Sequence, residues 1–253
     1  DYARSKILEI MRKELRSATP EMNTPVALRM ISLRALEAYC AEALANNIGT
    51  LPEEVRYLAG IQRIQFVFVY PEDGDVVLAG PGEGWRLDEN ANVVGVTTGR
   101  PVVQLDDLMA ALRYVDLART EGILCSIDPT EEGYRRVHQV LEAERRQSSF
   151  NSARIEPKVK RAFGPQQIRI AGVPATSHFA RVLVAADYRM KRLAMKLDAS
   201  PVKGLRSYID LIKGARVPAN TNPRWWMACN YDPVATSGNG LAWELRGPGV
   251  KVM

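Results

Sequence analysis

The sequence predicts an α+β protein with a mixed sheet, two β-hairpins and strand–helix pairs behind a helical N-terminal region. Two runs rich in β-branched and aromatic residues, 63–70 and 76–79, flank Asp73-Gly74, which is the pattern of a β-hairpin. Apolar residues recur at helical spacing over residues 105–115 and 177–197. The chain is therefore expected to contain both strands and helices.

The first sixty residues are predicted to be helical. The apolar positions 7, 8, 11 and 15 form one stripe of a helix over residues 2–17. Thr24-Pro25 opens a second helix that reaches about residue 45, because proline in a first turn loses no hydrogen bond. A short third helix ends near Gly60. We expect residues 1–60 to be a helical N-terminal region and residues 61–253 an α+β domain.

The remaining elements follow from turn and capping signals. A strand is expected over 122–127, followed by a helix with Asp128 as its N-cap and Pro129 in its first turn. Residues 147–153 are small and polar, which indicates a possible internal linker. The other expected elements are strands within 93–103 and 167–173, helices over 105–115, 177–197 and 207–213, and a second hairpin from 225–231 and 241–245.

The composition limits the class of protein. The chain has 253 residues, of which 46% are hydrophobic, with 34 basic and 29 acidic residues and a net charge of +5. Such a chain can bury a large core, and its ordinary glycine, proline and cysteine counts exclude collagen-like, disordered and disulfide-scaffold proteins. It contains no run of 18 apolar residues, so no membrane-spanning helix is expected.

Residue types that mark common cofactor sites are sparse. Gly80-Pro81-Gly82-Glu83-Gly84 follows a strand, but no helix start and no Gly-Lys-Ser/Thr follows, so we interpret it as a turn rather than a phosphate loop. The two histidines, His138 and His178, are forty residues apart, and no Cys-x-x-Cys motif is present. We expect no bound metal and no cofactor.

One polar cluster could carry chemistry if the fold assembled it. Cys125 to Asp128 lie at the C-terminal end of a predicted strand, where α/β enzymes often place functional groups. The sequence shows no base beside them, and helix capping and core packing are the alternative roles of these residues. The catalytic residues stay unknown, and the candidate polar cluster consists of Ser126, Asp128, His178, Asp187 and Arg189.

Charge is unevenly distributed along the chain. Residues 154–206 contain twelve basic and three acidic residues, a net charge of +9, whereas the remainder carries −4. The predicted helix over 177–197 has a candidate anion-binding face of Arg181, Tyr188, Arg192 and Lys196, and Asp187 can pair with Lys191. A solvated, partly paired face, or docking onto the acidic remainder, explains the same pattern. The absence of interleaved aromatic residues in the sequence speaks against nucleic acid.

Two further features concern partners and redox state. Trp225 and Trp226 would point to opposite faces of a strand, so one of them is a candidate interface residue. The three cysteines, Cys40, Cys125 and Cys229, lie among apolar residues, and we interpret them as buried free thiols, with one disulfide and an odd thiol as the alternative.

Several stretches together resemble an uncharacterised domain-of-unknown-function family found mainly in planctomycete bacteria. The resemblance implies an exported protein of the periplasm or envelope that belongs to a longer chain, and the start at Asp1 within a helical pattern fits removal of a signal peptide. It implies no activity, cofactor or catalytic residue. The stretches are Gly60-Ile61-Gln62-Arg63-Ile64, Val67-Phe68-Val69-Tyr70-Pro71, Ala79-Gly80-Pro81, Glu83-Gly84-Trp85, Cys125-Ser126-Ile127-Asp128-Pro129-Thr130, Asp187-Tyr188-Arg189-Met190-Lys191-Arg192-Leu193-Ala194-Met195 and Leu241-Ala242-Trp243-Glu244-Leu245-Arg246-Gly247-Pro248-Gly249-Val250.

Three functions from different classes remain. The sequence favours a non-catalytic exported binding or assembly protein of the bacterial envelope, with a protein partner or self-assembly and an anionic polymer as a further partner class. The alternatives are a hydrolase-like enzyme with a site near Cys125–Asp128 and Asp187–Arg192, and a cytoplasmic anion- or nucleic-acid-binding module.

Overall fold

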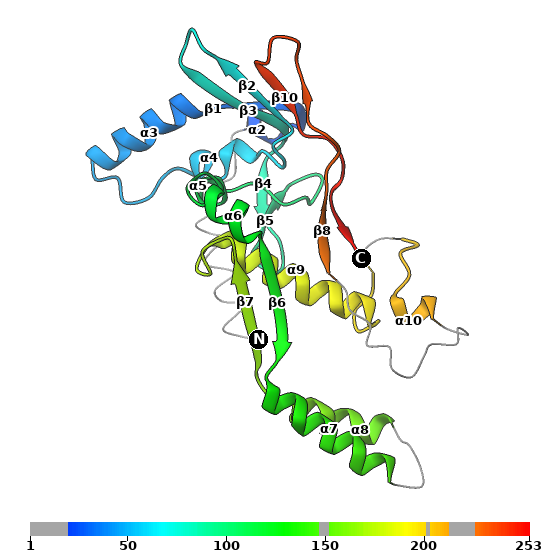
Figure 1. Ribbon diagram of the computed structural model, residues 1–253. Helices are drawn as coiled ribbons and strands as arrows, with labels where there is room; N and C mark the ends of the chain where they lie inside the picture. Colours follow the sequence, from blue (N-terminus) through cyan, green and yellow to red (C-terminus); the bar gives the residue numbers. More distant parts are fainter. Residues whose placement is uncertain (1–19, 147–151, 201–202, 213–225) are drawn as a thin grey trace. The chain divides into compact units, whose positions relative to one another are not determined.

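The computed structural model describes residues 20–146, 152–200, 203–212 and 226–253 (Figure 1). The predicted α+β class is confirmed, but the strands of this part of the chain form several small antiparallel sheets and no mixed sheet. The helix expected over residues 2–17, most of the linker expected at 147–153, and Trp225 lie outside the described residues.

The chain divides into two compact units. The first unit contains residues 1–109 and 228–251, and the second contains residues 110–227 and 252–253. The first unit is therefore built from two distant parts of the sequence.

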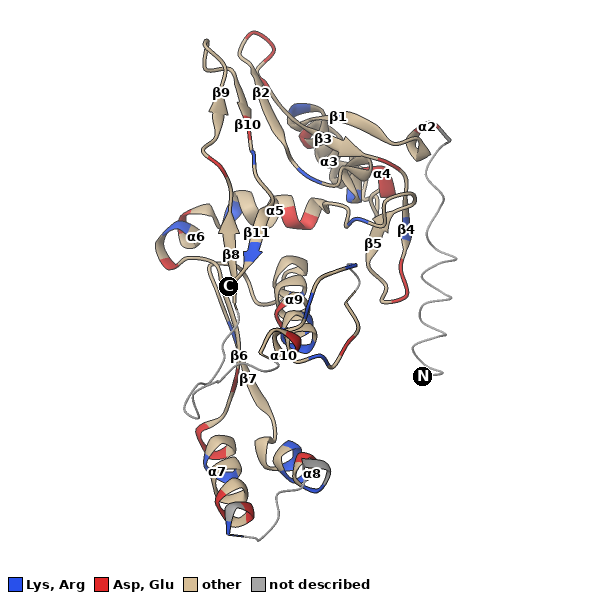
Figure 2. Cartoon of the chain, turned by 90° about the vertical axis from the view of Figure 1, so that its right-hand side faces the viewer, with Lys and Arg blue, Asp and Glu red and all other residues tan. Residues whose placement is uncertain are grey.

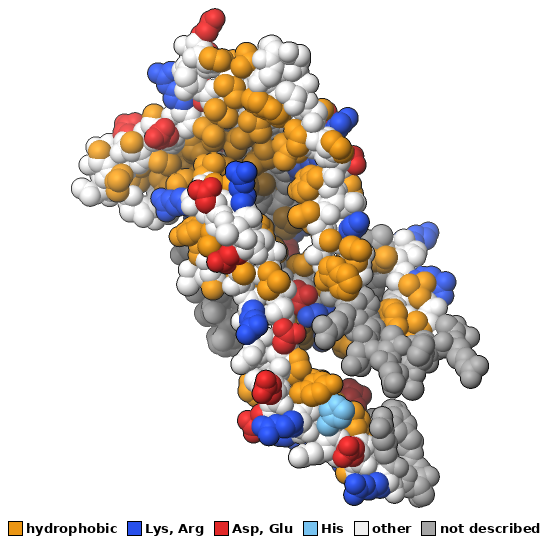
Figure 3. All heavy atoms as spheres, viewed as in Figure 1, with side chains coloured by type: hydrophobic (Ala, Val, Ile, Leu, Met, Phe, Trp, Pro, Cys, Tyr) orange, Lys and Arg blue, Asp and Glu red, His pale blue; other side chains and the backbone are white. Residues whose placement is uncertain are grey.

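A five-stranded antiparallel sheet forms the centre of the first unit. Its strands lie in the order β1-β3-β2-β10-β9. The predicted hairpin around Asp73-Gly74 is confirmed, because β2 pairs with β3 from Phe66↔Ala79 to Tyr70↔Asp75. The strands are β1 (Val26–Ser32), β2 (Phe66–Tyr70), β3 (Asp75–Gly82), β9 (Ala235–Thr236) and β10 (Ala242–Glu244). Apolar side chains remain at the surface over this sheet, as Figure 3 shows.

The helix predicted over residues 24–45 is wrong in its first part. Residues 26–32 form β1, which pairs with β3, and the helix α3 (Leu33–Ala45) begins only at Leu33. The Ser32 hydroxyl accepts a 3.0 Å hydrogen bond from the Ala35 N–H and so caps α3. Pairing with a neighbouring strand, which is remote in sequence, overrides the helical spacing of these residues.

The second predicted hairpin is wrong in its pairing. The strand β8 (Met227–Asn230) pairs with β11 (Gly249–Val252), whereas β10 pairs with β9 and with β2. Residues 237–241 thus connect β9 to β10, and β8 has a different partner. The sequence shows apolar runs here but does not show which of them meet.

Two apolar clusters fill the first unit. One is centred on Leu58, Ile61, Leu78 and Leu108, and the other on Tyr57, Trp85, Leu87, Val93 and Val102. Besides β3, the elements that supply them are the short helices α2 (Pro20–Asn23) and η1 (Leu58–Gly60), the strand pair β4 (Trp85–Leu87) and β5 (Val93–Gly95), and α5 (Leu105–Arg113), while the short helix α4 (Glu53–Arg56) ends just before Tyr57.

Glu83 lies buried in the first unit, with 1% of its surface exposed. Its carboxylate accepts hydrogen bonds from the N–H groups of Thr97 (2.8 Å) and Thr98 (3.0 Å), from the Gln62 side chain (2.5 Å) and from the Thr98 hydroxyl. The Arg29 guanidinium donates to the Glu83 carbonyl oxygen at 3.3 Å. A buried carboxylate with so many donors fixes the loop at 96–98 to the end of β3.

The pKa of Glu83 makes the stability of the first unit depend on pH. Burial raises this pKa, but the hydrogen bonds from Thr98 and Thr97 outweigh burial and lower it from 4.5 to about 2. The carboxylate is therefore ionised in the folded chain at pH values where it is protonated in the unfolded chain. Its stabilisation is complete above pH 4.5 and is lost as the pH falls towards 2.

We expect the difference in free energy of unfolding between the native chain and Glu83→Gln to shrink over that pH range. The pKa difference corresponds to on the order of 3 kcal/mol. Urea unfolding of both proteins between pH 7 and pH 2 measures this difference. The other carboxyl groups titrate in both proteins, so their contributions cancel. A difference that stays constant down to pH 2 would contradict the assignment.

A two-stranded ribbon organises the second unit. The strands β6 (Leu124–Pro129) and β7 (Gln166–Ala171) pair from Leu124↔Ala171 to Pro129↔Gln166. Two helices, α7 (Glu131–Arg145) and α8 (Ser152–Phe163), lie between these strands in the sequence and pack on each other. Glu144 of α7 is buried and forms ion pairs with Arg154 (2.7 Å) and Lys158 (2.5 Å) of α8. No separate element was expected where α8 lies.

The N-cap of α7 is Thr130, not Asp128 as the sequence suggested. The Thr130 hydroxyl accepts a 3.0 Å hydrogen bond from the Gly133 N–H, whereas Asp128 belongs to β6. The sequence pattern places the N-cap two residues before its actual position, because β6 continues through Pro129 and the helix starts only after Thr130.

Thr130→Ala is expected to destabilise α7 by about 1 kcal/mol, because the Gly133 N–H loses its acceptor. Asp128→Ala is the matched control and should leave α7 unchanged. Amide hydrogen exchange in peptides from residues 131–145 measures both. Equal effects of the two substitutions would contradict the assignment of the cap.

Three further helices belong to the second unit. These are α6 (Val115–Glu121), α9 (His178–Ala194) and α10 (Tyr208–Leu211). The long helix predicted over 177–197 is confirmed as α9, and Ser177 caps it by accepting a 3.1 Å hydrogen bond from the Ala180 N–H. Within the described residues, no helix is long and apolar enough to cross a membrane.

Candidate functional site

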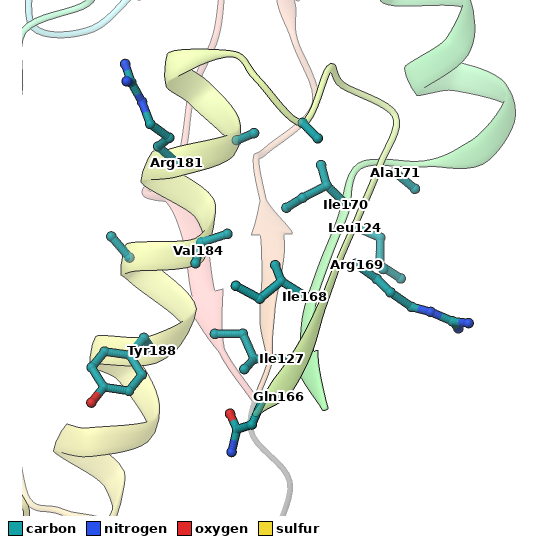
Figure 4. A pocket seen from close by; sticks show the side chains of 13 residues that line it. Leu124, Ile127, Gln166, Ile168, Arg169, Ile170, Ala171, Arg181, Val184 and Tyr188 are labelled. Carbon is teal, nitrogen blue, oxygen red and sulfur yellow. The ribbon is translucent and has the colours of Figure 1, made fainter. Parts of the chain in front are cut away.

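The ribbon of β6 and β7 presents two different faces. Cross-strand partners point to the same face, so the pairs Cys125↔Ile170 and Ile127↔Ile168 lie on one face. Figure 4 shows Ile127 and Ile168 directed towards α9 and Arg169 directed away from it. The ribbon therefore has an apolar face that meets α9 and a polar face on the other side.

Cys125 lies on the face that meets α9. Burial raises the pKa of its thiol, the nearby Asp187 carboxylate raises it further, and Lys191 acts in the opposite direction. A nucleophilic cysteine needs a lowered pKa, because the thiolate is the reactive form. The surroundings of Cys125 thus favour an unreactive thiol. Cys40, Cys125 and Cys229 are all free thiols, but Cys229 is exposed and the other two are half-buried, whereas all three were expected to be buried.

The candidate polar cluster does not converge on one cleft. Ser126 and Asp128 occupy the ribbon face opposite to Cys125, because side chains alternate along a strand. His178 and Asp187 are nine residues apart on α9, which separates them by about 14 Å along the helix and places them on opposite sides of it. Arg189 is exposed. The hydrolase-like alternative required these groups to face one another.

Asp187 has a local partner. Its carboxylate is buried, with 6% of the residue exposed, and lies 2.7 Å from the Lys191 ammonium group one turn later. The pairing of Asp187 with Lys191 that the sequence predicted is thereby confirmed. The pair neutralises a charge beside the apolar face of the ribbon.

The candidate anion-binding face on α9 is partly neutralised by acidic side chains of the same unit. Arg192 forms two hydrogen bonds with Asp198, at 2.8 and 2.7 Å, and lies 5.6 Å from the centre of the Tyr188 ring. The Asp198 carboxylate raises the pKa of Arg192. Lys196 lies 2.6 Å from Asp210. Figure 2 shows acidic and basic residues together around α9 and α10.

Trp226 is exposed over 52% of its surface. Its backbone N–H and C=O pair with those of Met253, at 3.2 and 2.9 Å. The structure thus leaves the candidate interface residue Trp226 at the surface, while Trp225 lies outside the described residues.

An open groove lies between α9 and the ribbon of the second unit (Figure 4). Its volume is about 1240 Å³. Two side chains that line it are half exposed: Ile168 over 55% and Leu124 over 50% of the surface. The groove is lined by Leu124, Ile127, Gln166, Ile168, Arg169, Ile170, Ala171, Ala175, Ala180, Arg181, Val184, Ala185 and Tyr188.

The groove is a functional candidate that the sequence did not reveal. The residues of α9 that line it, from Ala180 to Tyr188, recur every three to four positions and so look like a core-facing stripe. Ile168 and Ile170 likewise have the spacing of a half-buried strand. Helix and strand do meet, but α9 leaves Ile168 uncovered, and only the packing shows this.

No metal site is evident in the parts of the chain that the structure describes. No group of three or more histidine, cysteine, aspartate or glutamate side chains gathers there in a way that could hold an ion.

Residues 125–208 match a family model. It is described as "Protein of unknown function (DUF1598)". The matched region contains the ribbon, α7, α8 and α9, and therefore the whole groove except Leu124. Comparisons with curated proteins and with solved structures find no match. A domain of unknown function, as the resemblance implied, is thus confirmed for these residues.

Proposed function

We propose that this chain is a non-catalytic binding or assembly protein that contacts a protein partner through the groove between α9 and the ribbon. The half-exposed Ile168 in the groove wall is the observation that carries the proposal. A largely apolar groove whose wall leaves Ile168 and Leu124 half exposed has the composition expected of an interaction site.

The chemistry of the polar residues supports binding over catalysis. Cys125 has a raised pKa, Asp187 is paired with Lys191, and Ser126 and Asp128 lie on the opposite ribbon face. A nucleophile, a base and a group that orients the base must lie within hydrogen-bond reach of one another. The described residues around the groove supply no such set.

The proposal includes export to the bacterial envelope, which the resemblance to a planctomycete family suggests. Cell fractionation of the native host tests this directly. Recovery of the protein with cytoplasmic markers alone would overturn the localisation and leave the groove proposal standing.

Site-specific photo-crosslinking in the native host tests the groove. A photoreactive amino acid at position 168 is expected to give one defined crosslinked product. Position 135 on α7 is exposed and serves as the control, at which that product should be absent. If the folded chain gives no product at position 168, or the same products at both positions, the groove is not the binding surface.

A further inference from the structure

The strand β7 has an unpaired edge. Within the described residues, β7 pairs with β6 alone, and the sheet they form has two strands. One side of β7 therefore presents backbone N–H and C=O groups without a strand partner. Such an edge is a ready acceptor for a further strand, whose main-chain hydrogen bonds would complete the ladder.

The groove follows this edge. The four consecutive residues 168–171 all line it, although neighbouring residues of a strand point to opposite faces. A hollow that contacts both faces of one strand runs along its edge. The groove thus offers space for an added strand beside β7.

The two sides of this space differ in chemistry. Towards α9 it is mainly apolar, with Ile168 and Ile170 directed to the helix, where Val184 also lines the groove. On the other side the residues of β7 that line it are Arg169 and Ala171, and Leu124 of β6 lies on the same face. The residues that line the groove include Arg169 and Arg181 but no carboxylate, and Asp128 lies on the polar ribbon face two positions from the cross-strand partner of Arg169.

We propose that the edge of β7 binds an extended segment of a partner protein as a third strand, and that this segment alternates apolar and acidic residues. The apolar residues lie against Ile168 and Ile170 beside α9. The acidic residues lie on the opposite face, beside the Arg169 guanidinium. This inference rests on the proposed function, because it names the kind of partner that the groove takes.

A strand explains more of the site than a helix does. An amphipathic helix in the groove would cover Ile168, but its backbone groups are already bonded internally and could not pair with the edge of β7. It would also leave Arg169, on the far side of that edge, without a role. An added strand would pair with the backbone edge of β7, cover the apolar face at Ile168 and place acidic side chains beside Arg169.

Binding of labelled peptides tests the proposal. The probe is a blocked, fluorescein-labelled hexapeptide that alternates valine and glutamate. The controls are the same peptide with lysine for glutamate, and the valine–glutamate peptide with its alternate backbone nitrogens methylated. We expect the valine–glutamate peptide to bind at least tenfold more tightly than either control in fluorescence anisotropy, and to slow amide exchange within residues 166–171.

Two charge reversals complete the test. Arg169→Glu is expected to exchange the preference, so that the lysine peptide binds more tightly than the glutamate peptide. Arg135→Glu, at an exposed position on α7, should leave the preference unchanged. No saturable binding of the valine–glutamate peptide at millimolar concentration, or binding that backbone methylation does not weaken, would overturn the proposal.

The outcomes separate this inference from the proposed function. A crosslinked product at position 168 together with no effect of backbone methylation would keep the groove as a binding surface and reject strand addition. Binding of the peptide with no crosslinked product in the host would show a competent edge without a native partner, and the proposed function would then fail.

Discussion

Glu83→Gln is expected to lower the free energy of unfolding of the first unit by about 3 kcal/mol at pH 7. The amide group presents N–H donors where the native carboxylate accepts hydrogen bonds from the N–H groups of Thr97 and Thr98. At least one of these buried donors then loses its acceptor. The cation of Arg29, whose pKa Glu83 raises against the effect of burial, loses a compensating charge as well.

Urea unfolding followed by tryptophan fluorescence measures this loss, with amide exchange in residues 85–95 as a local readout. Trp85 is nearly fully buried in the apolar cluster two residues from Glu83 and reports on that region. Glu89→Gln removes a carboxylate from an exposed position in the same segment and is the control. Equal midpoints for the two variants would mean that the buried carboxylate does not stabilise the unit.

Gly60→Ala is the second substitution with a large expected effect, a loss of at least about 3 kcal/mol. Gly60 has a φ of +79°, which side chains other than hydrogen rarely allow, and a Cβ atom there would lie 1.9 Å from the Glu83 carbonyl oxygen. The backbone at Gly60 or at Glu83 would have to move, and this would displace Glu83 together with the groups that donate hydrogen bonds to its carboxylate.

Gly74→Ala separates the two causes. Gly74 also has a positive φ, +59°, but a Cβ atom there meets no other atom within 4 Å. We expect it to cost about 1 kcal/mol, which is the conformational penalty alone. Differential scanning calorimetry of both variants gives the comparison. Similar melting temperatures would contradict the close approach between residues 60 and 83, and a Gly60→Ala chain that does not fold while Gly74→Ala does would support it.

Local patterns predicted those elements whose partners are close in sequence. The β2–β3 hairpin needs only a four-residue turn around Gly74, and α9 carries its own cap and its own ion pair between Asp187 and Lys191. The information for both lies within about twenty residues. Sequence reasoning succeeds where turn chemistry and periodicity agree in this way.

Elements with distant partners could not be predicted in the same way. The strand β1 has helical spacing and becomes a strand because it pairs with β3, some fifty residues later. Ser32 was available as a start signal for α3 but lay inside an apparently continuous helical pattern. The helix α8 was missed for the opposite reason, because Pro157 inside it hides the stripe of Ile155 and Ala162, both of which are buried.

The surroundings of Glu83 and the groove could not be predicted either, because both depend on residues that are distant in sequence. Glu83 lies in a glycine-rich stretch that resembles an ordinary turn, and its donors come from residues 62, 97 and 98. The groove depends on how much of β7 remains beyond α9, which periodicity does not encode. Charge along the sequence pointed to α9, yet Arg192 of that helix and Lys196 just after it have acidic partners, and the cation of β7 that lines the groove is Arg169.

The α7–α8 pair begins and ends at neighbouring positions of the ribbon. Pro129 and Gln166, at which the two helices leave and rejoin the ribbon, are direct cross-strand partners. Such partners lie about 5 Å apart, a gap that a two-residue turn can close. The helical pair can therefore be removed without separating β6 from β7. Replacing residues 130–165 by an Asn-Gly turn should preserve the register of the two strands. Other domains could be inserted at the same point.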